Sequence, residues 1–568
     1  MGALGELNDV VDIFRERGKA DDEQKRVLDQ YDKYFESLSI QLDEFSRSIG
    51  EKKRPEKEDY RRLYDILQRN TDKKLESFDE LYDAFEDSET ETNLTREELY
   101  QWGRDLSDIA PRVPGTKSMD RTNQYIIDKL ESFGIKAWTE PINFNGVFFH
   151  EWSFEINSPK NKKYICFPEN NVGFGNVTAD IVDIGRGCEE DYKGKEVSGR
   201  IVLLNLGEIN EHEGPCAQRR RYTLLHLYDI AYANNVAGII VYFTDTPGNT
   251  IKLLEPGIKP IGGSNIWGPA EVGSNHQFTI PVLNIGRPDA EEIKELLKSG
   301  SVEGHIVIDG VRKVSTTNIV LGLLPGNGDR AISVGSHSCT AFEGAVCDTI
   351  GVVGTLALAK HFSGVPLEKR NKSLLFFFDS FHVWGNCCQT AITVLDRYKT
   401  LTANTDSMIW LDHIGNGKAD TIHNTTVSDN PVLWPLTAFS QYKYNIAPYV
   451  VPVVEIWSIC ATGAYQRIGI PTVTVQAMDE YTLTPEDTWD KFDPDVVYRD
   501  ILAHVDLAEA LQKLEVPLDH PVEPFGGCGS LFTDLSQPQY APGESYVPEP
   551  DYPLYVGGKD GEIQIIPR

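Results

Sequence analysis

Three apolar runs in the second half of the chain end on side chains that can bind a metal ion. The runs, each with the residues that follow it, are 331–334 before His337, 374–378 before Asp379 and His382, and 408–411 before Asp412 and His413. Short apolar runs bounded by polar residues are typical of strands buried within a parallel sheet. The carboxyl ends of such strands form the ligand-binding crevice of an open α/β sheet. The sequence therefore predicts an α/β fold in which these polar side chains converge.

Asp348 is a further candidate ligand near the first of these runs. It follows His337 by eleven residues and directly precedes the apolar stretch 349–362, which has the composition of a buried helix. The carboxylate can cap that helix, and it can also face the crevice. With His337, His382 and Asp412 it provides two imidazoles and two carboxylates. This donor set suits one tetrahedral or five-coordinate zinc ion, or another first-row metal.

The length of the chain indicates more than one domain. A single hydrophobic core seldom extends beyond ~250–300 residues, and the chain has 568, so we expect roughly two to four domains. The hydrophobic fraction of 40% and the charged fraction of 25% are those of a soluble globular protein. No stretch reaches the ~20 apolar residues that cross a bilayer. The first residues lack the basic and apolar segments of a signal peptide, so we expect a cytoplasmic protein.

The net charge of −31 bears on the kind of partner that the chain can bind. Such acidity disfavours the phosphate backbone of nucleic acids and the surface of an anionic membrane. It is compatible with a cationic or neutral substrate, although solubility or a salty cytoplasm explains it more simply. We therefore expect a small-molecule or peptide substrate, no nucleic acid and no membrane. A homo-oligomer formed through the N-terminal helices or the C-terminal arm described next is also compatible with the sequence.

Composition and periodicity divide the chain into five parts. Residues 1–95 carry many charges with apolar residues at helical spacing, which predicts an N-terminal helical region. Residues 96–164 and 311–515 are expected to form the two parts of the main α/β domain. Residues 165–310 are expected to form a separate domain inserted between them. Residues 516–568 are rich in Pro, Gly and Tyr, which predicts an extended arm over the surface or onto a neighbouring subunit.

The inserted segment has its own alternation of strands and helices. Strands are expected at 201–204, 237–243 and 278–283, and helices at 222–234 and 289–297. Strands that alternate with helices of this length are typical of a small α/β unit.

The nine cysteines are scattered and include no Cys-x-x-Cys pair of the kind that binds zinc. In a reducing compartment they are thiols, most often small buried hydrophobic residues. Cys339 and His382 could form a thiol–imidazole pair, but a buried inert thiol is favoured at this position.

Several motifs, in their order along the chain, resemble those of the M28 zinc aminopeptidases, in the subset that carries an inserted protease-associated (PA) domain. The matching segments are 109–116, 198–204, 235–240, 331–337, 344–348, 376–379, 411–415, 469–471 and 484–491. They cover roughly residues 100–512, and agreement among independent segments is a strong indication of fold. The resemblance implies an M28 aminopeptidase-like fold of the phosphorylase/hydrolase-like type. Such a fold has a mixed, mainly parallel sheet with helices on both faces, here with a PA-like domain at 165–310.

The resemblance also implies roles for the residues at the strand ends. Family members hold one zinc ion with a His, a bridging Asp and a second Asp, which correspond here to His337, Asp348 and Asp412. A second zinc ion takes the bridging Asp, a Glu and a late His. The Glu position is His382, which can still bind a metal, and the late His position is Leu483, which cannot.

Two further positions depart from the family pattern. The general-base Glu corresponds to Phe381, and the Asp that orients the first His corresponds to Cys339. General-base assistance contributes ~10²–10⁴-fold to rate, so turnover by the family mechanism is expected to be slow. Glu343 is the nearest carboxylate in sequence that could replace the lost base, and His413 is a second candidate for proton transfer.

The sequence therefore favours a metal-dependent enzyme that hydrolyses amide bonds in peptides or small acylated amines. It is expected to bind one divalent metal, zinc in the first place, through His337, Asp348, Asp412 and His382. Glu343, His382 and His413 are the candidate catalytic residues. Two alternatives stay open. One is a non-hydrolytic metal enzyme on the same scaffold, such as a lyase or an acyltransferase, and the other is a pseudo-peptidase that binds a ligand or partner without catalysis.

Overall fold

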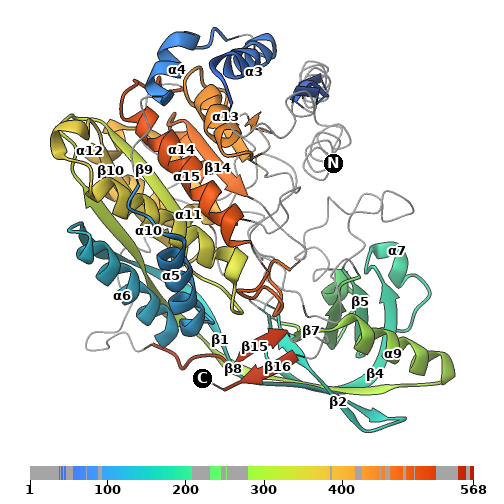
Figure 1. Ribbon diagram of the computed structural model, residues 1–568. Helices are drawn as coiled ribbons and strands as arrows, with labels where there is room; N and C mark the ends of the chain where they lie inside the picture. Colours follow the sequence, from blue (N-terminus) through green and yellow to red (C-terminus); the bar gives the residue numbers. More distant parts are fainter. Residues whose placement is uncertain are drawn as a thin grey trace.

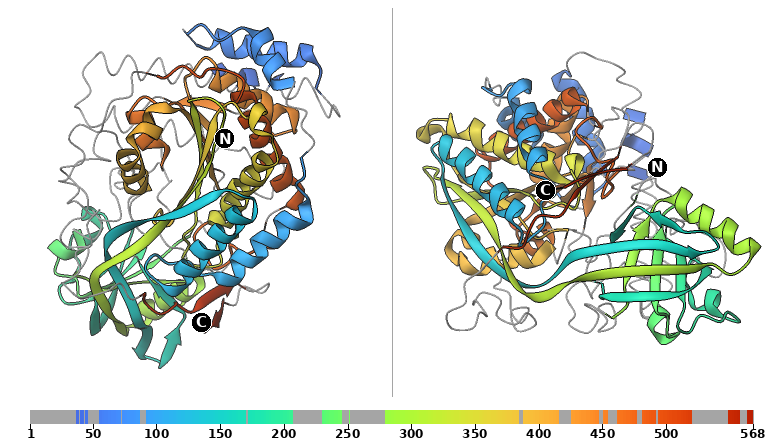
Figure 2. Two further views of the ribbon diagram at one scale, coloured as in Figure 1. Left: turned by 90° about the vertical axis from the view of Figure 1, so that its left-hand side faces the viewer. Right: turned by 90° about the horizontal axis from the view of Figure 1, so that it is seen from below.

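A computed structural model gives the structure of the protein (Figure 1). It describes residues 37–38, 40–42, 44–45, 55–71, 73–86, 92–169, 172–206, 230–244, 251, 279–383, 387–415, 425–446, 450–453, 461–476, 481–491, 493–519, 548–557 and 563–567. Two lobes are joined by a long two-stranded ribbon, whose strands run side by side in the right-hand view of Figure 2.

A mixed sheet runs through the larger lobe in the order β13-β12-β14-β11-β9-β10-β8, with β1 paired to the far side of β8. The strands are β13 (Val450–Val453), β12 (Thr425–Ser428), β14 (Thr472–Gln476), β11 (Thr405–Asp412), β9 (Ala331–His337), β10 (Ser373–Asp379), β8 (Glu303–Leu324) and β1 (Lys136–Ser158). The central strands β14, β11, β9 and β10 are mutually parallel, and β8 joins β10 antiparallel. The three apolar runs are thus adjacent parallel strands, as predicted.

Helices cover both faces of this sheet (Figure 2) because the apolar residues of each strand alternate between two cores. In β10, Phe376 and Phe378 belong to one core, and Leu375 and Phe377 belong to the other. The first core receives α5 (Arg96–Ile109), α6 (Lys117–Ser132), α10 (Ile350–Ser363), α13 (Leu433–Lys443) and α15 (Pro494–Leu511). The second receives α11 (Cys387–Arg397), α12 (Lys399–Asn404) and α14 (Thr462–Arg467). The predicted α/β class, with a mainly parallel sheet and helices on both faces, is confirmed.

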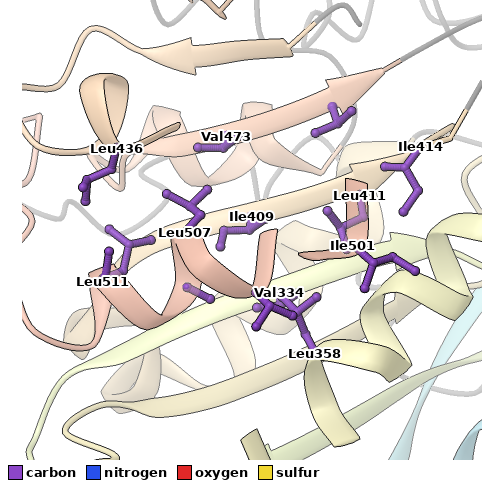
Figure 3. Close-up of a cluster of buried hydrophobic side chains, with 14 of the residues drawn as sticks. Val334, Leu358, Ile409, Leu411, Ile414, Leu436, Val473, Ile501, Leu507 and Leu511 are labelled. Atoms are coloured by element: carbon purple, nitrogen blue, oxygen red, sulfur yellow. The ribbon is translucent and has the colours of Figure 1, made fainter. Parts of the chain in front are cut away.

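The first core is the larger of the two and lies between the sheet and helices α10, α13 and α15. Figure 3 shows its centre, where Val334 and Ile409 of the sheet meet Leu358 of α10 and Leu507 of α15. Each of these four side chains is fully buried. Complete burial of an aliphatic side chain contributes about 1.5–3 kcal/mol, so this layer fixes the positions of the strand ends that carry the polar residues.

The N-terminal region is helical where the structure describes it. Helices α3 (Lys57–Arg69) and α4 (Phe78–Glu86) pack beside α13 (Figure 1). The Tyr60 ring meets the Phe439 ring edge-on, with centroids 5.4 Å apart. Residues 1–36 lie outside the described part of the chain.

The smaller lobe contains most of the segment that was expected to be inserted. Its strands are β2 (Lys162–Tyr164), β3 (Cys166–Pro168), β4 (Gly175–Gly185), β5 (Ile201–Asn205), β6 (Gly238–Tyr242) and β7 (Val282–Ile285), and its helices are α7 (Glu189–Tyr192) and α9 (Arg287–Ser299). The strands expected at 201–204 and 237–243 and the helix expected at 289–297 are present. The strand expected at 278–283 is displaced to 282–285. Most of the helix expected at 222–234 lies outside the described residues.

The lobes share the antiparallel ribbon of β1 and β8, whose pairing extends from Lys136 opposite Leu323 to Ser158 opposite Glu303. Strand β4 joins β8 and continues the hydrogen bonding into β5, β6 and β7. The chain therefore enters and leaves the smaller lobe through one continuous sheet.

The described part of the C-terminal arm lies on its own chain. A hairpin of β15 (Leu554–Gly557) and β16 (Ile563–Ile566) follows the buried Tyr552. The Phe149 main-chain N–H of β1 donates to the Tyr552 hydroxyl. A homo-oligomer through this arm or the N-terminal helices stays a prediction.

One helical stretch among the described residues, Ala345–Ser363, is apolar and long enough by composition and length to cross a membrane, but 94% of the residues concerned lie inside the protein. Such burial is typical of the core helix of an α/β protein.

Three of the described cysteines, Cys166, Cys339 and Cys347, are buried thiols, as expected. Cys188 is disulfide-bonded, which corrects the expectation that every cysteine is a thiol. Disulfides persist mainly in oxidising compartments, so this bond does not support a cytoplasmic location. That location stays a prediction.

Candidate metal centre

The ends of three neighbouring parallel strands bring His337, His382 and Asp412 together. Strand β9 ends at His337 and lies between β11, which ends at Asp412, and β10, which ends at Asp379 opposite His337. His382 follows three residues after the end of β10. All three side chains are at most 1% exposed. The predicted convergence of these residues is thus present in the structure.

The carboxylate of Asp412 lies near the Nε2 atoms of both imidazoles. Its Oδ1 is 3.3 Å from His337 Nε2, and its Oδ2 is 4.0 Å from His382 Nε2. The His337 and His382 rings are stacked, with centroids 4.3 Å apart and planes inclined by 12°. Ligand atoms of the three residues all lie within 4.8 Å of one another. In a tetrahedral zinc site the nitrogen and oxygen ligands are about 3.4 Å apart. His337 and Asp412 already have this spacing, whereas the His382 imidazole would have to move closer to Asp412 and tilt away from the His337 ring.

The main chain orients the His337 ring. Its Nδ1 lies 3.1 Å from the carbonyl oxygen of Cys339. A carbonyl can only accept, so Nδ1 carries the proton and Nε2 keeps its lone pair toward Asp412. Metal-binding histidines are commonly held in this way. At the position where the family resemblance expects an orienting Asp, the carbonyl of Cys339 fulfils the same purpose.

Asp348 braces the centre from the side of helix α10. Its Oδ1 accepts hydrogen bonds from the main-chain N–H groups of Gly351 and His413, both at 3.0 Å, and its Oδ2 accepts one from His337 at 3.3 Å. Its Oδ2 also lies 4.0 Å from His337 Nε2. Asp348 therefore caps a main-chain N–H in the first turn of α10, but among the described residues it belongs to neither of the two groups with metal-type spacing. Its part as a metal ligand stays a prediction.

The two carboxylates have opposite pKa shifts. Burial, together with the negative charge of Asp412, raises the pKa of Asp348 well above its ordinary value. Burial also acts to raise the pKa of Asp412, but the imidazoles of His413, His337 and His382 lower it by more, and the result is a net decrease. Burial lowers the pKa of His337. These directions favour negative charge on Asp412 over Asp348 and the neutral form of His337. A carboxylate and a neutral imidazole are the forms that bind a metal ion.

His413 belongs to the same cluster. Its Nε2 is 3.2 Å from Asp412 Oδ1, and its ring meets that of His337 edge-on, with centroids 5.8 Å apart. The main chain at His413 has φ = 55°, a left-handed conformation that non-glycine residues adopt rarely. That conformation accompanies the hydrogen bond from its N–H to Asp348. A strained backbone within a buried polar cluster is typical of functional sites.

Glu343 is not brought to this cluster. Its Oε1 accepts a hydrogen bond from the main-chain N–H of Trp489 at 3.0 Å, and burial raises its pKa. Among the described residues it belongs to neither of the two groups with metal-type spacing. The geometry therefore gives no support to Glu343 as a substitute base.

Solved structures of other proteins share this architecture. A peptidase M28 precursor from Shewanella amazonensis superposes with a TM-score of 0.60 at 17% sequence identity, over 77% of this chain and 98% of that one. A zinc aminopeptidase from Bacillus subtilis gives 0.57 at 14% identity, over 78% and 100%. An aminopeptidase from Aneurinibacillus sp. strain AM-1 gives 0.51 at 20% identity, over 76% and 97%.

The chain has the M28 aminopeptidase fold. At these identities the likeness concerns the fold, and no protein-family model and no curated protein matches the sequence. The order of motifs along the chain thus predicted the M28 fold correctly.

Phe381 and Leu483, the residues at which the family resemblance expects a general base and a late ligand, both have apolar surroundings. The Phe381 ring packs 4.7 Å from that of Phe144, in a small cluster with Phe148. Leu483 is 5% exposed and belongs to the same apolar cluster as Cys347. Neither position offers a polar side chain to a metal ion or to water.

Two buried charged residues, Arg112 and Asp487, hold the loop beside the cluster, and this role was not predicted. The Arg112 guanidinium donates to the carbonyls of Ser338, at 2.7 Å, and Glu343, at 3.3 Å. The carboxylate of Asp487 accepts from the N–H groups of Val346, at 2.8 Å, and Cys347, at 3.0 Å. Together they fix the loop between His337 and Asp348. Both lie in segments that matched the family, but a sequence motif does not show that the partners of a charged residue are main-chain groups.

Asp379 supports His382 in a similar way. Its Oδ1 accepts from the Phe381 N–H at 2.8 Å, its Oδ2 accepts from the Thr390 hydroxyl at 2.7 Å, and its carbonyl accepts from the Ser338 N–H at 2.7 Å. The turn that carries His382 is therefore attached to β9 and to α11. Such support for ligand-bearing turns is what holds a metal site in shape.

Proposed function

We propose that the chain is a metal-dependent hydrolase that binds one divalent metal ion, zinc in the first place, and cleaves amide bonds in peptides or small acylated amines. The observation that carries the proposal is the buried pair of stacked imidazoles, His337 and His382, whose Nε2 atoms lie 3.3 Å and 4.0 Å from the oxygens of the Asp412 carboxylate. Imidazole nitrogen and carboxylate oxygen are the ligands that zinc takes in catalytic sites. The peptidases and aminopeptidases of the same fold support the reaction class.

Each residue around the ligands has its own role in this proposal. A zinc ion held here supplies Lewis acidity. Asp348 holds the main chain of His337 and His413 in place through its hydrogen bonds. His413, with Nε2 at 3.2 Å from Asp412, is the titratable group placed to hold or move a proton beside the ligands.

A second candidate is a non-hydrolytic metal enzyme, a lyase or an acyltransferase. The apolar cluster around Phe381 favours it, because the residue at which the family resemblance expects the general base packs against Phe144 and has no group that can remove a proton from water. The pseudo-peptidase alternative differs from both in needing no metal ion.

Metal analysis and product analysis distinguish these functions. We expect elemental analysis of the purified chain to give one zinc-type ion per molecule, and His337→Ala to lose it. A panel of aminoacyl 4-nitroanilides and acylated amines, followed by mass analysis of products, then separates hydrolysis from elimination or acyl transfer. A chain that binds no divalent metal would overturn both enzyme proposals. A metal-loaded chain that is inert toward every amide would leave the second candidate.

A further inference from the structure

A sulfur atom also lies near His337 Nε2, the same ring atom that faces Asp412. Cys347 Sγ is 3.9 Å from His337 Nε2, and both side chains are fully buried. His337, Cys347 and His413 form a second group whose ligand atoms all lie within 4.8 Å of one another. His337 therefore belongs to two groups of metal-type donors, one that offers nitrogen and oxygen and one that offers nitrogen and sulfur.

The main chain holds Cys347 at this distance. Its N–H donates to Asp487 Oδ2 at 3.0 Å, and the preceding N–H, of Val346, donates to Asp487 Oδ1 at 2.8 Å. The residue that follows is Asp348, whose carboxylate is fixed by three main-chain N–H groups. In a tetrahedral zinc site a sulfur and a nitrogen ligand are about 3.6 Å apart. The sulfur thus needs to move by only a few tenths of an ångström.

Cys339 provides the contrast. It is also buried, and it lies only two residues from His337. Its Sγ, however, accepts a hydrogen bond from the Val383 N–H at 3.3 Å. Of the thiols that the structure describes, Cys347 alone belongs to a group with metal-type spacing.

We infer, on the basis of the proposed function, that Cys347 is a ligand of the same metal ion, so that the centre combines imidazole, carboxylate and thiolate donors. On binding, the thiol loses its proton to solvent and its sulfur lone pair forms the bond to the metal. No oxidant or reductant takes part. A thiolate favours softer divalent ions such as zinc and cobalt over magnesium or calcium, as do the imidazoles of His337 and His382.

Cobalt substitution tests this inference in the full-length chain. The purified protein is freed of metal with a chelator, loaded with one equivalent of Co²⁺, passed through a desalting column and measured by absorption. A cobalt–thiolate bond gives a strong charge-transfer band in the near ultraviolet, whereas imidazole and carboxylate ligands give only the weaker visible bands. We expect wild type and the control Cys339→Ser to show both features, and Cys347→Ser to keep the visible bands and lose the charge-transfer band.

The outcomes separate this inference from the proposed function. Visible bands without a charge-transfer band in wild type would overturn the thiolate ligand and leave the metal centre intact. A charge-transfer band that persists in full in Cys347→Ser would assign the sulfur to another cysteine and also overturn it. A chain that retains no cobalt would overturn the metal centre itself. The wild-type and Cys339→Ser spectra decide the first and last of these even if Cys347→Ser fails to fold.

Discussion

Asp348 and Asp412 are two buried carboxylates beside the imidazole of His337, and they have different partners. Asp348 accepts three main-chain N–H groups, whereas Asp412 lies among the side chains of His337, His382 and His413. The pKa of Asp348 is raised, first by burial and then by Asp412. Without a metal ion, the fold therefore favours the protonated form of Asp348.

This shift predicts how the stability of the metal-free protein depends on pH. A carboxyl whose pKa is higher in the folded than in the unfolded state stabilises the fold at low pH. That contribution falls as the pH rises from the unfolded pKa to the folded pKa, by about 1.4 kcal/mol per pH unit. Asp348→Asn removes this titration. We expect the metal-free variant to gain stability relative to wild type as the pH rises from 4 to 8, in thermal unfolding with a chelator present. A difference that is constant over this range would contradict the raised pKa.

Ligand loss is a second prediction at this scale. Asp412→Asn keeps the shape of the side chain but removes the negative charge beside the Nε2 atoms of His337 and His382. Because even residues that only support ligands contribute ~10–100-fold to metal affinity, we expect zinc affinity to fall by at least about 100-fold in competition with a chromogenic chelator. Asp379→Asn is the comparison. Because Asp379 only supports the turn before His382, its replacement should reduce zinc affinity by less. Equal losses in the two variants would argue that Asp412 is not a ligand.

At the level of residues, the sequence predicted which side chains at the strand ends lie close together. His337, Asp412 and His382 were found because buried parallel strands leave their carboxyl ends at one edge. Glu343 was proposed from its nearness in sequence, and the loop directs it to Trp489 instead. The direction of a side chain in an irregular loop depends on its tertiary partners, which no local pattern records.

Helix α10 supports the centre through a close approach at its first turn. A Cβ atom at Gly351 would lie 2.2 Å from Asp348 Oδ2 and 2.3 Å from the carbonyl oxygen of Leu411. Neither atom can yield easily, since one belongs to a candidate ligand and the other to the main chain of β11. The glycine therefore lets the helix, the strand and the Asp348 carboxylate come together.

Gly351→Ala tests whether this close contact at Gly351 is required, and Gly354→Ala in the same helix is the control. Alanine is the better helix former by about 0.5–1 kcal/mol, so helix propensity alone predicts that both variants are stabilised. We expect Gly351→Ala to be destabilised instead, by about 1–3 kcal/mol as in other overpacked sites, and to lose metal affinity. At Gly354 the added atom meets the Ile414 Cδ1 at 2.8 Å, a side-chain end that can move. Chemical denaturation and chelator competition measure both effects, and unchanged metal affinity in Gly351→Ala would refute the argument.

At the level of elements, short apolar strands and the helix at 349–362 were predicted well, because a buried element requires an apolar composition. The long ribbon of β1 and β8 was not predicted. Its middle carries polar side chains and glycines, such as Gly310, where an added Cβ would lie 2.0 Å from the carbonyl oxygen of Phe148. Glycine in a sequence usually indicates a turn, whereas here it permits a close approach of two strands. The pairing of such distant segments is not encoded in either one alone.

The whole molecule is held together by this ribbon and by the C-terminal segment that lies across it. Glu549 pairs with Lys313 of β8, and Asp551 accepts from the Ser118 N–H and from Arg121. Tyr555 then packs edge-on against Phe167 of the smaller lobe, with ring centroids 5.2 Å apart. The composition of residues 516–568 indicated an arm but could not show where it binds. The described part binds to the same chain and connects the two lobes.

Two truncations test whether the arm stabilises the monomer. Removing residues 548–568 takes away Tyr552 and Tyr555, which are both buried, and deletion of one large buried aromatic side chain typically costs about 3–5 kcal/mol. Removing 558–568 takes away only β16, where Ile565 and Ile566 are 48% and 39% exposed. We expect the longer truncation to lower the midpoint of thermal unfolding markedly and the shorter one to lower it little. We also expect light scattering to give the same mass per particle for both as for the full chain. A longer truncation that leaves stability unchanged but dissociates an oligomer would show that the arm acts between subunits.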